Sequence, residues 1–237
     1  LLKQVIKIKP EFIEAYNNLG NVFQELGKYR EAESFYRMAI NLNPDYAEAQ
    51  YNLGKIFQEL GKNKEAVFIY QKVIQINFKY IKAHNNLGNV FQKLGKNKEA
   101  LSCFQQAIKL NPAYTEAHNN LGNVFQELGN NKEALTCYRL AIKLNPQYAE
   151  AHYNLGFAFQ ELGKNREALA CYRRAIKLNP DYVEAHYNFG VVFQELGKYR
   201  EALPVYQKVI DVNFNYIKAH NNMGLVLQEL GKYREAL

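Results

Sequence analysis

The fold is decided by a stretch that the chain repeats many times with small changes. Residues 115–148 read TEAHNNLGNVFQELGNNKEALTCYRLAIKLNPQY, and closely related stretches precede and follow it at a spacing of 34 residues. A glycine recurs at this spacing, at Gly20, Gly54, Gly88, Gly122, Gly156, Gly190 and Gly224. A period of this length predicts a stack of small helical units instead of a globular domain around one central core.

Each unit has the pattern of two helices. In residues 115–148, Ala117, Leu121 and Val124 recur every three or four residues, which is typical of the buried face of a helix. Gly129 and the two asparagines after it supply a turn. A second apolar stripe then runs over residues 134–144, and an Asn-Pro pair ends it. The sequence therefore predicts an all-α chain built from antiparallel helix pairs.

The period also predicts how the chain is divided. With Ile13 as position 1, we expect one solenoid over residues 1–237, with full repeats at 13–46, 47–80, 81–114, 115–148, 149–182 and 183–216. Residues 1–12 are the tail of a preceding repeat, and residues 217–237 form a partial one. Because a single pair cannot bury its own apolar stripe, neighbouring units must stack. Uncapped ends of such a stack would expose apolar surface, so end-to-end self-association is an expectation.

This pattern resembles the tetratricopeptide repeat (TPR). Most units share with that family an aromatic residue or histidine at position 4, Leu-Gly at positions 7 and 8, Phe at 11, Ala at 20, Tyr or Phe at 24 and Pro at 32. In character the chain is similar to the superhelical TPR domain of O-linked N-acetylglucosamine transferases and to related bacterial TPR proteins. The resemblance implies a right-handed superhelical solenoid whose first helices line a concave side.

Histidines and cysteines occur in register with the repeat. Position 4 holds His84, His118, His152, His186 and His220, and position 23 holds Cys103, Cys137 and Cys171. Equivalent positions in stacked helices lie at least about 10 Å apart, which is too far for a shared metal ion or a disulfide. We therefore expect packing roles for both sets, and no cofactor, metal site or catalytic residue. The sequence predicts a protein that is not an enzyme.

The net charge of +7 raises the question of nucleic-acid binding. Most of the lysines and arginines fall in turns and on the second helix of each pair, where a solvated outer surface accounts for them. We expect no nucleic-acid partner. No apolar run approaches the roughly 18 residues that cross a bilayer, and no secretory signal is visible. A soluble, cytoplasmic protein without a membrane partner is the expectation.

One stripe of each first helix does not pack against the second helix of its pair. At about 100° per residue, positions 2, 5, 6, 9 and 13 lie together on the side away from the second helix. Position 6 is Asn in all seven units, and position 12, at the edge of the stripe, is always Gln. Primary amides both donate and accept hydrogen bonds, which suits the backbone of an extended peptide. Positions 2 and 13 are mostly Glu, which favours neutral or basic segments.

The predicted peptide-binding residues follow from this stripe. They are Asn18, Asn52, Asn86, Asn120, Asn154, Asn188 and Asn222 at position 6, Gln92, Gln126 and Gln160 at position 12, Tyr153 and Tyr187 at position 5, Phe157 at position 9, and Glu116 and Glu150 at position 2. The resemblance implies the same role for the position-6 asparagines, because a ladder of such residues holds extended peptide in similar TPR proteins. A structural alternative is that these asparagines bond to a neighbouring helix and serve stacking alone.

Three functions are compatible with these features. The leading hypothesis is a protein-interaction scaffold that binds extended, neutral to basic proteins or peptides in a concave groove lined by Asn, Gln and Glu. The chain could instead be a substrate-recruiting arm of a larger enzyme such as a glycosyltransferase. The third alternative is a structural element that assembles end to end.

Overall fold

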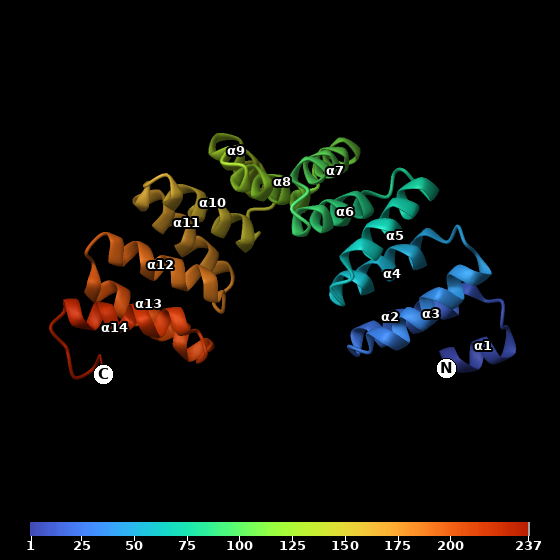
Figure 1. The fold of residues 1–237 in the computed structure, drawn as a ribbon, viewed down its shortest axis with the longest axis horizontal. Coiled ribbons are helices and arrows are strands. Elements are labelled where there is room, and N and C mark those ends of the chain that lie inside the picture. Colours follow the sequence, from blue (N-terminus) through green and yellow to red (C-terminus); the bar gives the residue numbers. More distant parts are fainter. Residues whose placement is uncertain (237) are drawn as a thin grey trace. The chain divides into compact units, whose positions relative to one another are not determined.

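The computed structural model describes residues 1–236, and all of their regular secondary structure is helical (Figure 1). The helices are α1 (Leu2–Ile8), α2 (Ile13–Glu25), α3 (Tyr29–Leu42), α4 (Ala47–Glu59), α5 (Asn63–Ile76), α6 (Ile81–Lys93), α7 (Asn97–Leu110), α8 (Thr115–Glu127), α9 (Asn131–Leu144), α10 (Ala149–Glu161), α11 (Asn165–Leu178), α12 (Val183–Glu195), α13 (Tyr199–Val212) and α14 (Ile217–Glu229). The predicted all-α fold of paired helices is confirmed. The even-numbered helices from α2 onward are the first helices of the repeats, and the division into repeats remains a prediction.

The chain forms two compact units, which are described separately. Unit 1 comprises Leu1–Asn120, and unit 2 begins at Leu121. In unit 1 the pairs α2–α3, α4–α5 and α6–α7 pack together, and the second helix of one pair also contacts the first helix of the next. Unit 2 repeats this arrangement from α9 to α14. The first helices α2 and α4 touch in unit 1, as do α10 and α12, and α12 and α14, in unit 2.

Two kinds of turn connect the helices. The first helix of a pair ends at a glycine in the left-handed region, such as Gly61 with a φ of 70°. There the Lys62 N–H donates to the Phe57 carbonyl at 2.7 Å, the long bond of a Schellman motif. The second helix ends at an asparagine whose side chain caps the following backbone, as Asn43 Oδ1 accepts from the Asp45 N–H at 3.0 Å. These turns reverse the chain at the same two points of each repeat.

Each helix pair encloses one aromatic ring. The ring at position 24 is almost fully buried in Tyr36, Tyr70, Phe104, Tyr138, Tyr172 and Tyr206. It lies against the glycine at position 8 of the same repeat, where a larger residue would leave no room. Alanines at position 20 are completely buried beside it, as in Ala32 and Ala66. Small residues on one helix and a ring on the other therefore set the close approach of the pair.

Candidate binding face

The first-helix face is the surface formed by positions 2, 5, 6, 9 and 13 of α2, α4 and α6 and by Glu116, Asn119 and Asn120 of α8 in unit 1, and by the same positions of α10, α12 and α14 in unit 2. Several of its position-6 asparagines are hydrogen-bonded to the repeat before them. Asn52 Nδ2 lies 3.1 Å from Asn17 Oδ1 and 3.1 Å from Asn21 Oδ1. Asn120 Nδ2 donates to Asn85 Oδ1 at 3.1 Å in the same register. The structural role that the sequence left open as an alternative is therefore present.

The same donor uses a different acceptor where position 5 is tyrosine. Asn86 Nδ2 donates to the Tyr51 hydroxyl at 3.0 Å, and Asn188 Nδ2 donates to the Tyr153 hydroxyl at 3.1 Å. Asn222 Nδ2 donates to the Tyr187 hydroxyl at 3.1 Å. A carboxamide oxygen and a phenol oxygen both accept a hydrogen bond, so position 5 can vary while position 6 stays constant.

These contacts bury part of the predicted stripe. At position 5, Asn17, Asn85 and Asn119 are only 0 to 4% exposed, so the stripe is not open to solvent along its whole length. The cause is the adjoining repeat, whose position-6 amide bonds to Asn17 and Asn85. At position 6, Asn18 is exposed, Asn52 is buried, and the other five asparagines are half-buried.

Two of the three predicted glutamines accept hydrogen bonds from buried tyrosines of the core. The Oε1 atoms of Gln126 and Gln160 accept hydrogen bonds from the buried Tyr138 and Tyr172 hydroxyls at 2.9 and 2.8 Å. Gln160 also donates through Nε2 to Glu195 Oε1 at 3.1 Å. Gln92 is half-buried on α6. Because a buried hydroxyl without a partner is costly, Gln126 and Gln160 stabilise their helix pairs as well as edge the binding face.

The remaining predicted residues are more open. Glu116 and Glu150 are exposed, and Tyr153 and Tyr187 are half-buried. The Tyr148 hydroxyl donates to Glu150 Oε2 at 3.2 Å. Phe157 is 37% exposed. Unit 2 thus presents apolar and acidic side chains together on its first-helix face.

A row of tyrosines that precede the first helices is absent from the predicted binding residues. Ring centroids of Tyr153 and Tyr182 lie 5.0 Å apart, and those of Tyr187 and Tyr216 lie 5.2 Å apart. Position 34 is Tyr in every repeat, at Tyr46, Tyr80, Tyr114, Tyr148, Tyr182 and Tyr216. That constancy was the signal that could have found them.

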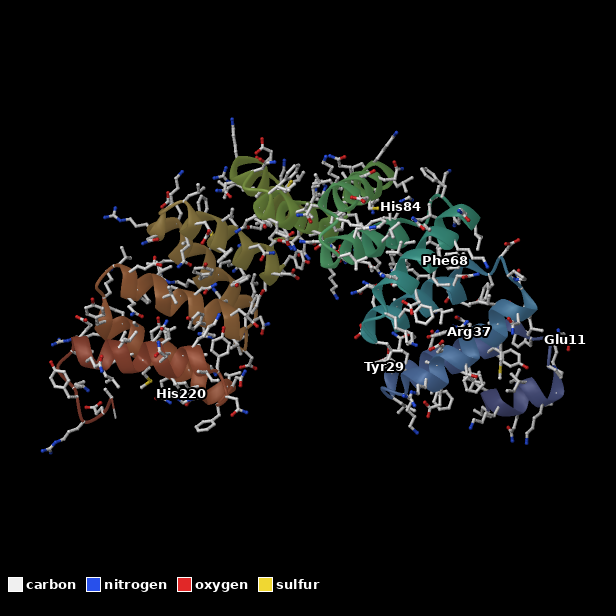
Figure 2. The ribbon with its side chains drawn as sticks, viewed as in Figure 1. Glu11, Tyr29, Arg37, Phe68, His84 and His220 are labelled. Carbon is white, nitrogen blue, oxygen red and sulfur yellow. The ribbon has the colours of Figure 1, made fainter. Side chains whose placement is uncertain are left out.

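The histidines hold the turns between repeats. His84, labelled on α6 in Figure 2, has its Nε2 2.8 Å from the Phe78 carbonyl. His118 makes the equivalent contact with the Pro112 carbonyl at 2.9 Å. Each ring N–H donates to the carbonyl, so the side chain bridges the end of one repeat and the first helix of the next. Within residues 1–236, no group of three or more His, Cys, Asp or Glu side chains could hold a metal ion.

The cysteines pack at the helix pairs. Cys103, Cys137 and Cys171 are free thiols and half-buried. Burial is the main cause that raises the pKa of each thiol to about 11, which keeps it protonated near neutral pH. Among the described residues, no helix is both long and apolar enough to cross a bilayer.

Two surface hollows lie outside the positions of the first-helix face. One of about 420 Å³ is lined by Arg37, Phe57 and Phe68, of which Figure 2 labels Arg37 and Phe68. Unit 2 has a hollow of about 300 Å³ at the corresponding positions, lined by Phe125 and Lys132 among others. Because both recur at the same repeat positions, we attribute them to the regular packing of the helices.

The inter-repeat bonds predict a difference between two equivalent asparagines. Replacement of the buried Asn52 by alanine leaves Asn17 Oδ1 without its donor, while Asn21 Oδ1 keeps the Tyr36 hydroxyl at 2.8 Å. The change should lower the free energy of unfolding by about 1 to 3 kcal/mol. Asn18 is exposed and has no hydrogen-bond partner in the described chain, so Asn18→Ala should change stability by only a few tenths of a kcal/mol, roughly. Urea unfolding followed by circular dichroism measures both. Equal losses would contradict the role of the inter-repeat bond.

The comparisons with protein families agree with this geometry. Models described as tetratricopeptide repeat match residues 11–77, 81–114 and 103–136, and a model described as TPR repeat matches 122–163, 161–197 and 192–231. The chain belongs to the tetratricopeptide-repeat family. Its repeats make it a protein-interaction scaffold.

Solved structures show the same fold. The chain is similar to a chain of the APC/C hetero-tetramer Cut9-Hcn1, with a TM-score of 0.85 and 18% identity over 95% of this chain and 45% of that one. It therefore spans less than half of that relative. YrrB, described as a TPR protein with an unusual peptide-binding site, matches with a TM-score of 0.60 and 28% identity over 78% of this chain and 95% of that one. MamA matches with a TM-score of 0.62 and 23% identity over 72% and 93%. No curated protein matches the sequence.

Proposed function

We propose that the first-helix face binds an extended polypeptide, in part through its backbone. The observation that carries this proposal is the row of position-6 asparagines, five of which are oriented by bonds to the preceding repeat, namely Asn52, Asn86, Asn120, Asn188 and Asn222. Those bonds use the amide N–H groups, so the side-chain oxygen is the atom proposed to accept from a ligand N–H. The oxygens of Asn86 and Asn222 also accept from the asparagine before them at 3.4 and 3.5 Å, and a carboxamide oxygen can accept a second bond. Packed helices lie about 10 Å apart, which corresponds to roughly three residues of extended chain.

Charge supports a neutral or basic ligand. Positions 2, 9 and 13 of the seven units contain eleven glutamates and four lysines, although the whole chain is positive. An acidic face attracts cationic segments and repels phosphate backbones. Proteins or peptides are therefore the proposed partners, with no nucleic acid, membrane or cofactor involved and no catalysis.

Peptides selected from a random display library, about 12 residues long and roughly 40 Å when extended, test this function. Affinity for the full chain is measured by fluorescence anisotropy. N-methylation of a peptide amide that faces an asparagine oxygen removes the donor, and each such change should weaken binding about fivefold. If N-methylation at every position leaves the affinity unchanged, backbone recognition is wrong.

The location of the site is tested by charge reversal. Glu161→Lys with Glu229→Lys places two cations on the exposed position 13 of α10 and α14 and should weaken basic peptides about tenfold or more. The matched control is Glu133→Lys with Glu167→Lys, which makes the same change on the second helices α9 and α11. Equal losses in the two variants, or a library from which no peptide binds, would overturn the proposed function.

A further inference from the structure

The beginnings of α10 and α12 bring two tyrosine rings and two carboxylates together. Tyr153 and Tyr182 have ring centroids 5.0 Å apart at an interplanar angle of 41°. The Tyr153 hydroxyl accepts from Asn188 Nδ2 at 3.1 Å, which fixes that ring. Glu150 lies in the first turn of α10 and Glu184 in the first turn of α12, and both are exposed.

The charges of the two carboxylates contribute to the raised pKa values of these tyrosines. Burial is the main cause of the raised pKa of Tyr182, and the charges of Glu150 and Glu184 raise it further. Burial also raises the pKa of Tyr153, with a further contribution from Glu184. The negative charges therefore lie close to the phenol groups, and a cation placed there would meet carboxylates and aromatic faces together.

Two sister pairs in the same chain differ at one position. The ring centroids of Tyr51 and Tyr80 lie 5.0 Å apart, and position 2 is Glu48 on α4 and Lys82 on α6. The ring centroids of Tyr187 and Tyr216 lie 5.2 Å apart, and position 2 is Glu184 on α12 and Lys218 on α14. In both sister pairs the second of these positions is a lysine, where the Tyr153–Tyr182 pair has a second glutamate. Of the three pairs in the described residues, only Tyr153–Tyr182 has two carboxylates and no lysine at these positions.

We propose that Tyr153, Tyr182, Glu150 and Glu184 form a subsite for the side chain of a lysine or arginine in the bound polypeptide. This cation subsite rests on the proposed function and specifies its ligand. A cation of the ligand would meet two carboxylates here, whereas one of the two position-2 residues is a lysine in each sister pair. The tyrosine rings pack against the alkyl stem of a lysine or the guanidinium plane of an arginine, and the carboxylates favour its positive charge.

Norleucine keeps the stem of lysine and removes its charge. In a peptide bound to the full chain, the change from the critical lysine to norleucine should weaken binding about tenfold. Glu150→Gln with Glu184→Gln should weaken the lysine peptide by a similar factor and leave the norleucine peptide unchanged. The norleucine peptide should therefore bind the Glu150→Gln, Glu184→Gln variant no more weakly than it binds the original chain, because the peptide change and the protein change remove the same interaction.

The sister pairs provide the controls. Glu48→Gln makes the same chemical change beside Tyr51 and should leave the preference for lysine unchanged. Lys218→Glu gives the Tyr187–Tyr216 pair its second carboxylate and should increase the affinity of peptides with a second basic residue. If Glu48→Gln abolishes the preference as fully as the Glu150 and Glu184 variant, the preference reflects general charge and the subsite is wrong.

A probe without a peptide chain separates the two proposals. N-acetyl-lysine methylamide, titrated at millimolar concentrations, should shift the NMR resonances of the Tyr153 and Tyr182 rings and not those of Tyr51 and Tyr80. Peptide binding with no loss on norleucine substitution and no ring shifts would overturn the subsite while the proposed function stands. Ring shifts without any peptide binding would support the subsite and overturn the proposed function.

Discussion

Between pH 10 and pH 12 the protein should lose stability steeply. Tyr206 is fully buried, and its pKa is raised from 10.0 to about 12, mainly by burial. The unfolded chain releases this proton from pH 10 upward, whereas the folded chain retains it until about pH 12. Stability that is fully present below pH 10 is therefore lost as the pH rises, by about 1.4 kcal/mol per pH unit for this residue. Tyr36, Tyr70, Tyr138 and Tyr172 are also buried with raised pKa values and act in the same direction.

Urea unfolding at a series of pH values measures this loss, with phenolate absorbance as the second signal. Tyr206→Phe is the control, and the chain already has Phe104 at the equivalent position of another repeat. The variant loses the hydrogen bond to Gln194 Oε1 at 2.9 Å, so it should be about 1 kcal/mol less stable at neutral pH. Its decline above pH 10 should nevertheless be shallower than that of the original chain. Titration of all tyrosines near their ordinary pKa with helices intact would contradict the prediction.

Gly54→Ala should destabilise unit 1 strongly. A Cβ atom at Gly54 would lie 2.6 Å from Tyr70 Cε1 and 2.9 Å from its Cζ, closer than atoms can approach. The Tyr70 ring is fully buried, so it has no free space to move into. Either the ring or the helix α4 must shift, and overpacking of this kind costs about 1 to 3 kcal/mol.

The matched control for Gly54→Ala is Gly224→Ala, at the same repeat position of α14. There the nearest atom to an added Cβ is the Ala236 carbonyl oxygen at 3.9 Å. Alanine has the same helix-propensity advantage of about 1 kcal/mol at both sites, so the difference between the variants isolates the clash. Thermal unfolding followed by circular dichroism should show a clear fall only for Gly54→Ala. Similar melting curves would show that the ring can be displaced at little cost.

The repeat pattern predicts the fold well because one local rule operates throughout the chain. The spacing of Ala117, Leu121 and Val124 predicted a helix, and α8 covers Thr115–Glu127. Helices α2 and α4 begin at Ile13 and Ala47, the residues at which the period places repeat starts. Helix periodicity depends only on residues near in sequence, which one chain displays in full.

The candidate face was harder to predict, because its polar contacts join residues about one repeat apart. The constant asparagine at position 6 is visible in the sequence. The sequence does not show, however, whether the side chain of Asn52 contacts a ligand or the side chain of Asn17. A helical wheel describes one helix and omits the next repeat, so it does not show that Asn17 at position 5 is buried. The tyrosines before each first helix were missed for the same reason, since Tyr182 meets Tyr153 only when α10 and α12 pack together.

The asparagine at position 6 is the same in every repeat, whereas position 5 of the preceding repeat is either asparagine or tyrosine. Asn52 bonds to an asparagine of the preceding repeat, whereas Asn86 bonds to Tyr51. A repeat copied, deleted or moved by recombination would therefore meet a usable acceptor in either kind of neighbour. Rearrangement of whole repeats leaves no buried amide without a partner at the new junction, so the length and order of the array can drift while each junction remains stable.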